Sequence, residues 1–317
     1  MRLLRVALNF LRVKRASNPE VNPIGLGDPP IRPQSAELHR SFRIITKRRL
    51  KVVVSGAAYV AARATHLICR VMGYPAKQKL VILYYHAVNS EFRENFARQL
   101  DILKAYYDIV SADNDRITES SRPSVAITFD DAFESVLDNA LPELKSRCMP
   151  ATIFVPAGVL GRQPAWDMED GCADRGEIVA SADALLAAAS DLIQFGAHTL
   201  THPHLLRISA EEARREIGDC RQQMRDIFGM EIDTLSFPYG EYSSAIVELC
   251  REAGYRRVFN SVPATLDPAS AEFVRGRILV EASDGPLEFS LKISGAYSWM
   301  GYYSNIRQAF RNGHRIA

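Results

Sequence analysis

Residues 125–131 read Val-Ala-Ile-Thr-Phe-Asp-Asp, the pattern of a buried strand that runs directly into two carboxylates. Positions 125–129 are rich in β-branched and aromatic residues and carry no charge, which is typical of a strand. Asp130 and Asp131 follow without a break. Two adjacent carboxylates at the end of a buried strand lose hydration and repel each other unless a cation or a shared proton compensates. This strand end is therefore a candidate functional site.

Segments with the patterns of strands and helices alternate from residue 80 onward. The apolar segments of strand length are 80–85, 125–129, 152–155, 192–196, 234–237 and 274–280, and the helical ones include 133–147, 181–190, 209–228 and 243–253. Ser209 and Glu212 form a capping box at the start of the longest of these helices. Such alternation indicates a parallel sheet with helices outside it. We predict an α/β fold, a deformed (β/α) barrel of about seven parallel strands with a helical basic N-terminal extension.

Polar residues follow two further strands of this series. His198 and His202 come after 192–196, and Pro203 disfavours a helix at His202, so both imidazoles lie on a loop. Two histidines and one carboxylate from separate strand ends form a ligand set for a divalent metal with open positions. The segment 234–237 leads into Pro238-Tyr239-Gly240, a turn that is able to aim a backbone N–H into the site.

Each cluster taken alone has an ordinary structural interpretation. An Asp-Asp pair is most often a turn or a helix N-cap, a His-x-x-x-His spacing is a weak metal signal, and Pro-Tyr-Gly is usually just a turn. Three such clusters in order, each at the end of a separate predicted strand, favour one shared site at the carboxyl end of the barrel.

At these residues the sequence resembles the NodB-homology polysaccharide deacetylases, carbohydrate esterase family four. The family motif T-F-D-D-G is matched by residues 128–132, with Ala132 in place of the glycine. The motif H-[ST]-x-x-H-P is matched in full by residues 198–203, and the motif ending P-Y-G by residues 238–240. The resemblance covers about residues 80–282 and includes features of the exopolysaccharide-type branch.

The resemblance implies a role for each motif residue. It implies that Asp130 is the general base and that Asp131, His198 and His202 hold Zn²⁺ or a similar divalent ion, with Co²⁺, Ni²⁺ and Mn²⁺ as alternatives. Such an ion lowers the pKa of bound water and polarises the acetyl carbonyl. The oxyanion is then held by the metal and by the backbone N–H of Tyr239.

Two positions depart from the family pattern. Many members carry an arginine ahead of the third motif that orients the catalytic aspartate, where this chain has Ser236. Arg277 matches an arginine of the exopolysaccharide-type branch and is our candidate to substitute. Many members also take the general acid from a late Leu-x-His motif, and His314, the one histidine after residue 204, is not in that context. His86, at the end of the first strand, is our candidate acid, with a structural histidine as the alternative.

Three further residues are candidates around this site. Trp166 is able to stack on a sugar ring and Asp167 to hydrogen-bond it, whereas the alternative is a loop tryptophan that covers core. We interpret His204 as structural rather than as a ligand, because three protein ligands already leave the open positions that a catalytic metal needs.

The charge of the chain is divided unevenly. Residues 1–80 carry 16 Lys and Arg against 3 Asp and Glu, a net +13, and the remainder carries 23 against 34, a net −11. Such asymmetry indicates a basic appendage on an acidic body. We predict an extension over 1–79, a deacetylase domain over 80–282 and a C-terminal extension over 283–317. The acidic body, without a nucleic-acid-binding motif, argues against nucleic acid as a partner.

The basic segment contains three kinds of sequence. Residues 1–15 predict a short basic amphipathic helix rather than a signal peptide, because the uncharged run 6–11 is too short. Residues 17–37 carry five prolines and predict a linker. Residues 50–72 predict an amphipathic helix whose uncharged stretch is shorter than the roughly 20 residues of a membrane span. Two interpretations remain open for 1–72: peripheral attachment to an anionic membrane, or packing against the domain.

The cysteines indicate a reducing compartment. There are five, scattered and without a Cys-x-x-Cys spacing: Cys69, Cys148, Cys172, Cys220 and Cys250. That is neither a disulfide framework nor a zinc-ribbon pattern. We expect a cytoplasmic location without a signal peptide, at the inner face of the membrane if the extension attaches there.

Together these features predict a metal-dependent deacetylase that hydrolyses N-acetyl groups of N-acetylglucosamine-type sugars in a bacterial poly- or oligosaccharide. A nodulation-type chitooligosaccharide deacetylase and an O-acetyl esterase are alternatives on the same fold. A non-catalytic glycan-binding or assembly protein that retains the metal site is an alternative of another class. The residues alone do not separate these possibilities.

Overall fold

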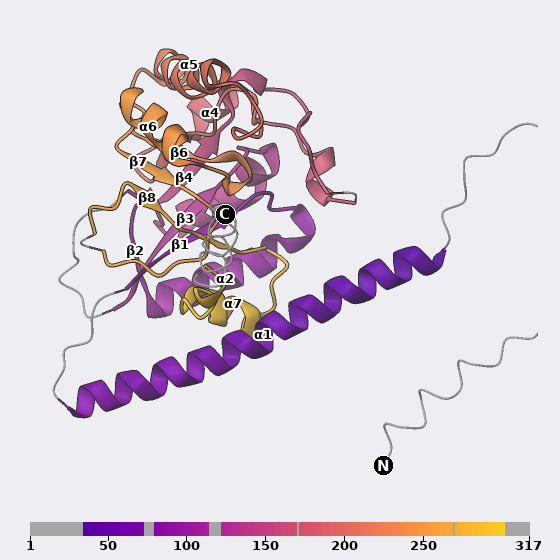
Figure 1. Ribbon diagram of the computed structural model, residues 1–317, viewed down its shortest axis with the longest axis vertical. Coiled ribbons are helices and arrows are strands. Elements are labelled where there is room, and N and C mark those ends of the chain that lie inside the picture. The colour runs from indigo at the N-terminus through magenta and orange to yellow at the C-terminus, as the bar shows by residue number, and fades with distance from the viewer. Residues whose placement is uncertain (1–33, 73–78, 114–121, 170, 269, 302–317) are drawn as a thin grey trace, which may run out of the picture. The chain divides into compact units, whose positions relative to one another are not determined.

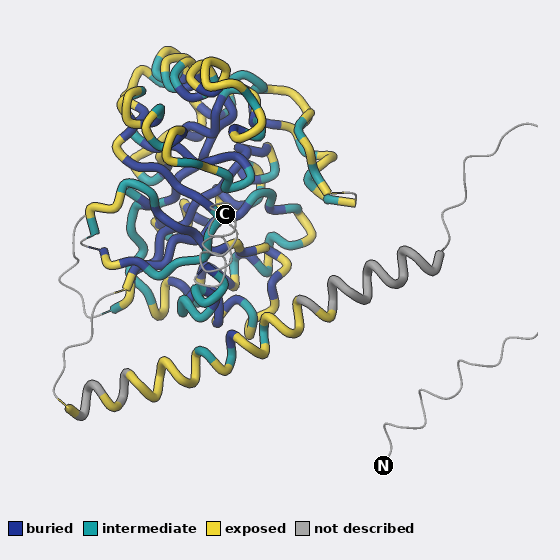
Figure 2. The backbone as a smooth tube through the Cα atoms, viewed as in Figure 1, coloured by how far each residue is buried: buried dark blue, intermediate teal, exposed yellow. Residues whose placement is uncertain are grey.

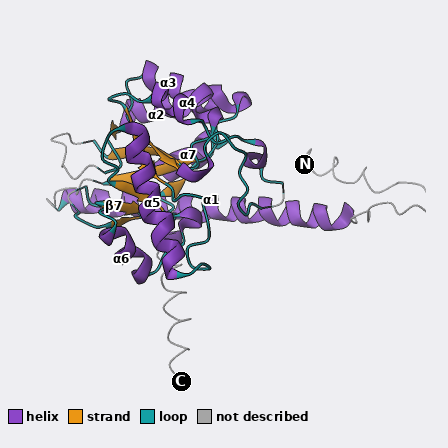
Figure 3. Ribbon diagram, turned by 90° about the horizontal axis from the view of Figure 1, so that it is seen from above, coloured by secondary structure: helices purple, strands orange, loops and turns teal. Residues whose placement is uncertain are grey.

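The computed structural model describes residues 34–72, 79–113, 122–169, 171–268 and 270–301. Contacts within the chain divide it into two units, Met1–Lys47 and Arg48–Ala317. The predicted boundaries at residues 79/80 and 282/283 remain predictions, and residues 1–33, with the predicted short helix and most of the linker, lie outside the described part. In the second unit the strands lie in the middle and helices surround them (Figure 1, Figure 3).

One sheet of parallel strands organises this unit. Its strands are β1 (Leu80–Tyr85), β2 (Asp108–Ile109), β3 (Ser124–Phe129), β4 (Ala151–Val155), β5 (Ile193–Ala197), β6 (Thr234–Ser236), β7 (Arg257–Phe259), β8 (Val274–Arg275) and β9 (Ile278–Leu279). Their order is β8-β7-β6-β5-β4-β3-β1-β9, and β2 pairs with β3. Because β8 pairs with β7 while β9, two residues later, pairs with β1, the sheet curls round on itself. This confirms the predicted deformed barrel.

The predicted strand 274–280 is wrong in one respect, because it forms two short strands rather than one. Gly276 and Arg277 separate β8 from β9. A Cβ atom at Gly276 would lie 2.3 Å from the carbonyl oxygen of Val262, so only glycine lets the chain pass here. The break lets one segment pair with two different strands.

Seven helices accompany the strands in the described residues. They are α1 (Gln34–Val71), α2 (Arg93–Tyr106), α3 (Leu141–Ser146), α4 (Ala182–Ala188), α5 (Ala210–Phe228), α6 (Ser244–Glu252) and α7 (Pro286–Ile293). The capping box of α5 is confirmed, with the Ser209 side chain bonded to the Glu212 N–H and the Glu212 carboxylate to the Ser209 N–H. The predicted helix 133–147 begins instead with a wide π turn over Val136–Ala140. Pro142 has no N–H to donate to the preceding turn, which interrupts the regular helix there.

Both faces of β1, β3 and β4 are buried, and the middle of the sheet is dark blue in Figure 2. Alternate residues such as Val81, Leu83 and Tyr85 of β1 point outward into the main hydrophobic core. The residues between them, including Leu80 and Ile82, point inward and pack with a smaller cluster that contains Phe154 and Phe259. The sheet therefore has a filled interior, and ligand chemistry is confined to its ends.

Helix α1 is longer than predicted. It begins at Gln34 rather than near Leu50, and so takes up the last four residues of the predicted linker. Ser55 of α1 is buried, and its hydroxyl oxygen accepts a hydrogen bond of 3.0 Å from the Trp299 indole N–H. In the described part of the chain, no helix has the length and apolar character to cross a membrane.

Candidate metal centre and active site

Three loops at the carboxyl ends of β3, β5 and β6 carry the predicted site residues. Asp130 and Asp131 directly follow β3, His198 directly follows β5 and His202 lies on the same loop, and Tyr239 lies in the turn after β6. Since parallel strands end at the same edge of the sheet, these loops converge. The structure thus brings together the three clusters that the sequence separates by about 110 residues.

These loops contain nearly all of the strained backbone of the described chain. Six described residues other than glycine have a positive φ, and five of them lie in the three motifs. The five are Asp131 (φ 69°), Ala132 (53°), Thr199 (63°), His202 (60°) and Tyr239 (57°). A left-handed backbone is unfavourable for a residue with a Cβ atom and persists only where the surroundings enforce it. Such strain concentrates at functional sites.

Asp131, His198 and His202 are arranged as ligands for one metal ion. Asp131 Oδ1 lies 3.4 Å from His198 Nε2 and 3.5 Å from His202 Nε2, and ligand atoms of all three residues are within 4.8 Å of one another. Asp131 Oδ1 is buried and has no hydrogen-bond partner among the described residues. A buried carboxylate oxygen facing two imidazole nitrogens is costly without a cation, so the three residues fit a bound divalent ion.

The pKa of His202 and the orientation of the His198 ring also suit a metal. Burial, and then the neighbouring His198, lower the pKa of His202 to about 3, so that its ring is neutral, as ligation requires. His198 Nδ1 lies 2.8 Å from the carbonyl oxygen of Ser236, which orients the ring and leaves Nε2 directed at Asp131. Burial raises the pKa of Asp131, but His198 and His202 outweigh this and hold it below the usual carboxyl range.

Asp130 is held by Arg277. The guanidinium donates two hydrogen bonds to the Asp130 carboxylate, from Nη1 to Oδ1 and from Nη2 to Oδ2, each 2.7 Å long. The same Nη2 atom donates to Ser236 Oγ at 2.7 Å. Arg277 is therefore positioned as the predicted substitute for the missing arginine. The small side chain of Ser236 leaves room for it and accepts one of its hydrogen bonds.

The charge of Arg277 lies inside the barrel among aromatic rings. Its guanidinium carbon is 4.6 Å from the ring centre of Tyr84 and 5.3 Å from that of Phe154. These contacts stabilise the buried cation. Burial raises the pKa of Asp130, but Arg277, followed by His198, outweighs it, and the pKa falls well below the ordinary carboxyl range. Asp130 is thus a buried carboxylate that stays ionised.

His86, the candidate acid, lies near both carboxylates. It follows β1, and its charge contributes to lowering the pKa of Asp130 and of Asp131. Asp174 lies close to it as well: burial raises the pKa of Asp174, and His86 works in the opposite direction. His86 therefore lies within electrostatic range of both carboxylates, and its role as the acid remains a prediction.

An aromatic wall borders the metal triad. The Trp166 ring lies 4.5 Å from that of His202 and stacks on Phe133 at 6.4 Å. Tyr239 lies against His202 edge to face at 4.7 Å. Trp166 packs on the main core as well as on His202, so the core-covering alternative describes a real contact, whereas stacking on a sugar ring stays a prediction. The Asp167 side chain is 82% exposed and lies 3.6 Å from His204.

Sequence reasoning missed two residues that complete the site. Thr128 accepts a hydrogen bond from Arg277 at 3.1 Å. It lies two residues before Asp130 on the same strand face, so the alternation of the strand was the available signal. Asn260 accepts from Arg277 Nε through its backbone carbonyl at 3.2 Å. Every residue type has a backbone carbonyl oxygen, so the sequence does not predict this contact.

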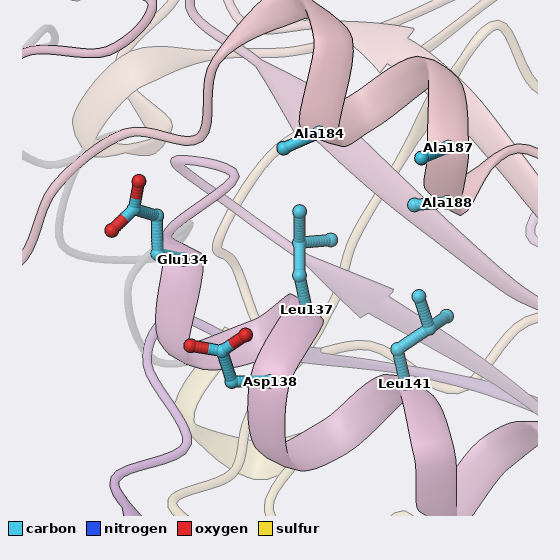
Figure 4. A pocket seen from close by; sticks show the side chains of 7 residues that line it. All are labelled: Glu134, Leu137, Asp138, Leu141, Ala184, Ala187 and Ala188. Carbon is cyan, nitrogen blue, oxygen red and sulfur yellow. The ribbon is translucent and has the colours of Figure 1, made fainter.

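A pocket elsewhere on the molecule does not belong to this site. It has a volume of about 500 Å³ and lies between the π turn, α3 and α4 (Figure 4). Leucine and alanine side chains form most of its lining, with Glu134 and Asp138 at one end. None of its lining residues belongs to the metal triad or contacts Arg277.

Known proteins similar to this chain are polysaccharide deacetylases. Residues 118–258 match the family model for polysaccharide deacetylase. The poly-β-1,6-N-acetyl-D-glucosamine N-deacetylase of Staphylococcus aureus is 24% identical over 188 residues, which cover 57% of this chain and 60% of that protein. The chain thus spans well under two thirds of the length of this relative.

Two solved structures share the fold. The structure of IcaB from Ammonifex degensii has a TM-score of 0.59 and 27% identity, and the match covers 69% of this chain and 97% of that one. The Streptococcus pyogenes deacetylase PplD, solved in complex with acetate, has a TM-score of 0.56 and 20% identity and covers 69% of this chain and 99% of its own. The curled parallel sheet, the Asp-His-His cluster and these matches together show a NodB-homology fold that carries the metal-ligand cluster of the polysaccharide deacetylases, the carbon–nitrogen hydrolases to which residues 118–258 are similar.

Proposed function

We propose that this chain removes N-acetyl groups from a poly-N-acetylglucosamine-type glycan. The observation that carries the proposal is the ionised Asp130, held by Arg277 beside the Asp131, His198 and His202 cluster. A buried carboxylate that stays charged next to a metal cluster is suited to accept a proton from water. The similarity to the staphylococcal enzyme supports N-acetylglucosamine units as the substrate class.

The residues divide the chemistry among them. Asp131, His198 and His202 would hold a divalent ion, which would supply the Lewis acidity that activates water and polarises the acetyl carbonyl. Asp130 takes the proton of the attacking water, and its two bonds to Arg277 fix the direction from which it does so. The Tyr239 backbone N–H donates to the developing oxyanion. His86 protonates the leaving amine, which becomes the free amino group of the sugar.

We propose zinc as the metal. The Asp131 oxygen lies 3.4 and 3.5 Å from the two imidazole nitrogens, and ligands at about 2.1 Å around a tetrahedral ion are separated by about 3.4 Å. Two histidines and one carboxylate are also a ligand set that zinc prefers over magnesium or calcium. Calorimetric titration of the metal-free protein with Zn²⁺, Co²⁺, Ni²⁺ and Mn²⁺ tests this choice. Stronger binding of Mn²⁺ than of Zn²⁺ would contradict it.

Acetate release tests the activity. The zinc-loaded protein is incubated with β-1,6-linked N-acetylglucosamine oligomers, with chitooligosaccharides and with an O-acetylated glycan, and free acetate is measured. We expect release from the first substrate, and loss of at least about 100-fold in rate with Asp130→Asn, because a general base contributes that much. Zinc binding by Asp130→Asn should remain, since Asp130 is not a proposed ligand. Zinc binding without acetate release from any substrate would favour the non-catalytic alternative.

His86 as the general acid has its own test. His86→Ala should lower kcat for an amide substrate but have little effect on an activated acetate ester, whose leaving group needs no proton. Asn95→Ala on α2, a substitution outside the site, is the matched control. Equal losses on both substrates would contradict the assignment and indicate a structural role.

We also propose that residues 1–72 attach the protein to an anionic membrane surface, at the cytoplasmic face. Leu50, Val53 and Val60 on α1 are 62%, 68% and 67% exposed. Their spacings of three and seven residues place them on one side of the helix, opposite the buried Ser55. The net charge of +13 over residues 1–80 complements anionic lipid headgroups. An exposed apolar stripe on a basic helix supports this proposal.

Liposome flotation tests the attachment. The full chain should float with vesicles that contain phosphatidylglycerol and much less with phosphatidylcholine vesicles. Val53→Glu combined with Val60→Glu should abolish flotation. The control, Leu186→Glu with Met230→Glu, replaces exposed apolar residues elsewhere and should float normally. Equal flotation of both double variants would exclude this face as the membrane contact.

A further inference from the structure

The turn that carries Tyr239 is under strain. Tyr239 has φ 57° and ψ 5°, and Gly240 follows with φ 67°. The two hydrogen bonds of the turn are donated by Gly240 to Phe237 and by Glu241 to Pro238. Neither of them uses the Tyr239 N–H. The turn therefore leaves this N–H available in a conformation that a tyrosine does not favour by itself.

His204 stacks on the ring of this tyrosine. The two ring centres are 3.7 Å apart and the planes differ by 8°. His202, a proposed metal ligand, lies against the edge of the same ring at 4.7 Å. The Tyr239 side chain is thus held between the metal loop and a second histidine of that loop. Its backbone cannot relax toward an ordinary turn without breaking the stack.

Acidic side chains hold His204 in turn. Its Nδ1 atom lies 3.0 Å from Glu241 Oε2, and its Nε2 atom lies 3.6 Å from Asp167 Oδ2. Glu241 is the residue whose N–H closes the strained turn. Its contact with His204 therefore links the stacked histidine to the same turn that carries Tyr239. Asp167 also lies close to the Tyr239 phenol, whose pKa is raised to about 12 by burial and then by the charge of Asp167. Three segments of the chain therefore converge on one ring.

We propose that His204, anchored by Glu241, is a positioning residue that holds Tyr239 in the left-handed turn and so fixes the backbone N–H that meets the oxyanion. This inference rests on the proposed deacetylase function. In this proposal His204 neither binds the metal nor contacts the sugar. It keeps the Tyr239 backbone N–H in the position that it must have before the transition state forms. Precise placement of such a donor affects kcat rather than substrate binding.

Substitutions at His204 test the proposal. His204→Ala removes the stack and the anchor, and kcat should fall about 3- to 10-fold, the loss that corresponds to one aromatic pair, with KM unchanged. His204→Phe keeps the stack without the anchor and should recover most of kcat. Zinc affinity, measured by calorimetry, should equal that of the wild type in both variants. The crystal structure of His204→Ala should show the 238–240 turn displaced or in more than one conformation.

A double-mutant cycle separates positioning from other roles. Tyr239→Gly removes the ring that His204 contacts and relieves the strain, so adding His204→Ala to it should cause no further loss of kcat. An equal loss in both backgrounds would overturn the proposal, as would weaker zinc binding or a rise in KM alone. Absence of acetate release by the wild-type protein would instead contradict the proposed function, and the conformation of the turn in His204→Ala would still decide the inference.

Discussion

Arg277 shows how one side chain makes the chemistry of a site possible. Its guanidinium is almost fully buried, yet it meets carboxylate, hydroxyl and backbone oxygens as well as aromatic faces. A buried Asp130 without it would be driven toward the neutral acid, which is unable to take a proton. The fork-shaped guanidinium also satisfies both carboxylate oxygens at once, which a lysine ammonium does not.

Replacing this arginine should therefore cost both stability and activity. We expect Arg277→Ala to lower the free energy of unfolding by about 3–5 kcal/mol, because it leaves a buried charge unpaired, and to abolish acetate release. Arg277→Lys should retain part of the stability but little activity. Urea unfolding and acetate release measure the two effects. Arg214→Ala, which breaks only the exposed pair with Glu252, is the control and should change stability by less than about 1 kcal/mol.

Gly240 is the second residue on which the site geometry depends. A Cβ atom there would lie 1.7 Å from Ser261 Oγ, and its φ is 67°. Gly240→Ala should therefore displace the turn that carries Tyr239 and lower kcat, while zinc affinity stays constant. Ser261→Gly in the same chain removes the side-chain clash but leaves the Ser261 backbone nitrogen 2.9 Å from the new Cβ atom and leaves the backbone strain, so it should restore activity only in part. Full activity of Gly240→Ala would show that this turn tolerates displacement.

At the scale of elements, the sequence predicts secondary structure that depends on neighbouring residues but not the pairing of strands that are distant in sequence. The strand over residues 80–85 and the capping box at Ser209 depend on side chains near in sequence, and both were predicted correctly. The split of 274–280 depends on which strands lie on either side of it, information that the segment itself does not contain. The metal triad was predictable because its ligands follow the ends of two buried strands, Asp131 after β3 and the two histidines after β5. The stack of His204 on Tyr239 was not, since it depends on how two loops meet.

The capping box gives an element-level prediction. Ser209→Ala should lower the free energy of unfolding by about 1 kcal/mol, because it leaves an N–H at the start of α5 without its acceptor. Acetate release should be unaffected, since the box lies outside the site. Ser209→Asp, which also caps well, should restore the stability. Loss of activity with unchanged stability would mean that α5 is coupled to the site.

At the scale of the whole molecule, Asp284 joins segments that are far apart in sequence. Its buried carboxylate pairs with Arg48 at 2.8 Å and with Lys292 at 2.6 Å. Its backbone carbonyl accepts from Gln99 of α2, whose side chain also bonds the Tyr85 hydroxyl at the end of β1. Residues 283–301 and the part of α1 from Arg48 are thus integrated with the barrel, although charge and family resemblance place them outside it.

This integration predicts how truncated chains behave. A chain that begins at residue 48 should keep the unfolding free energy of the full chain, because the compact unit starts at Arg48. A chain that begins at residue 73 loses the Arg48–Asp284 pair and the Ser55–Trp299 hydrogen bond, and should be less stable by about 2–3 kcal/mol. Arg48→Ala in the full chain should reproduce part of that loss, and urea unfolding measures all three. Equal stability of the two truncated chains would instead support the domain boundary predicted near residue 80, with α1 as a dispensable attachment.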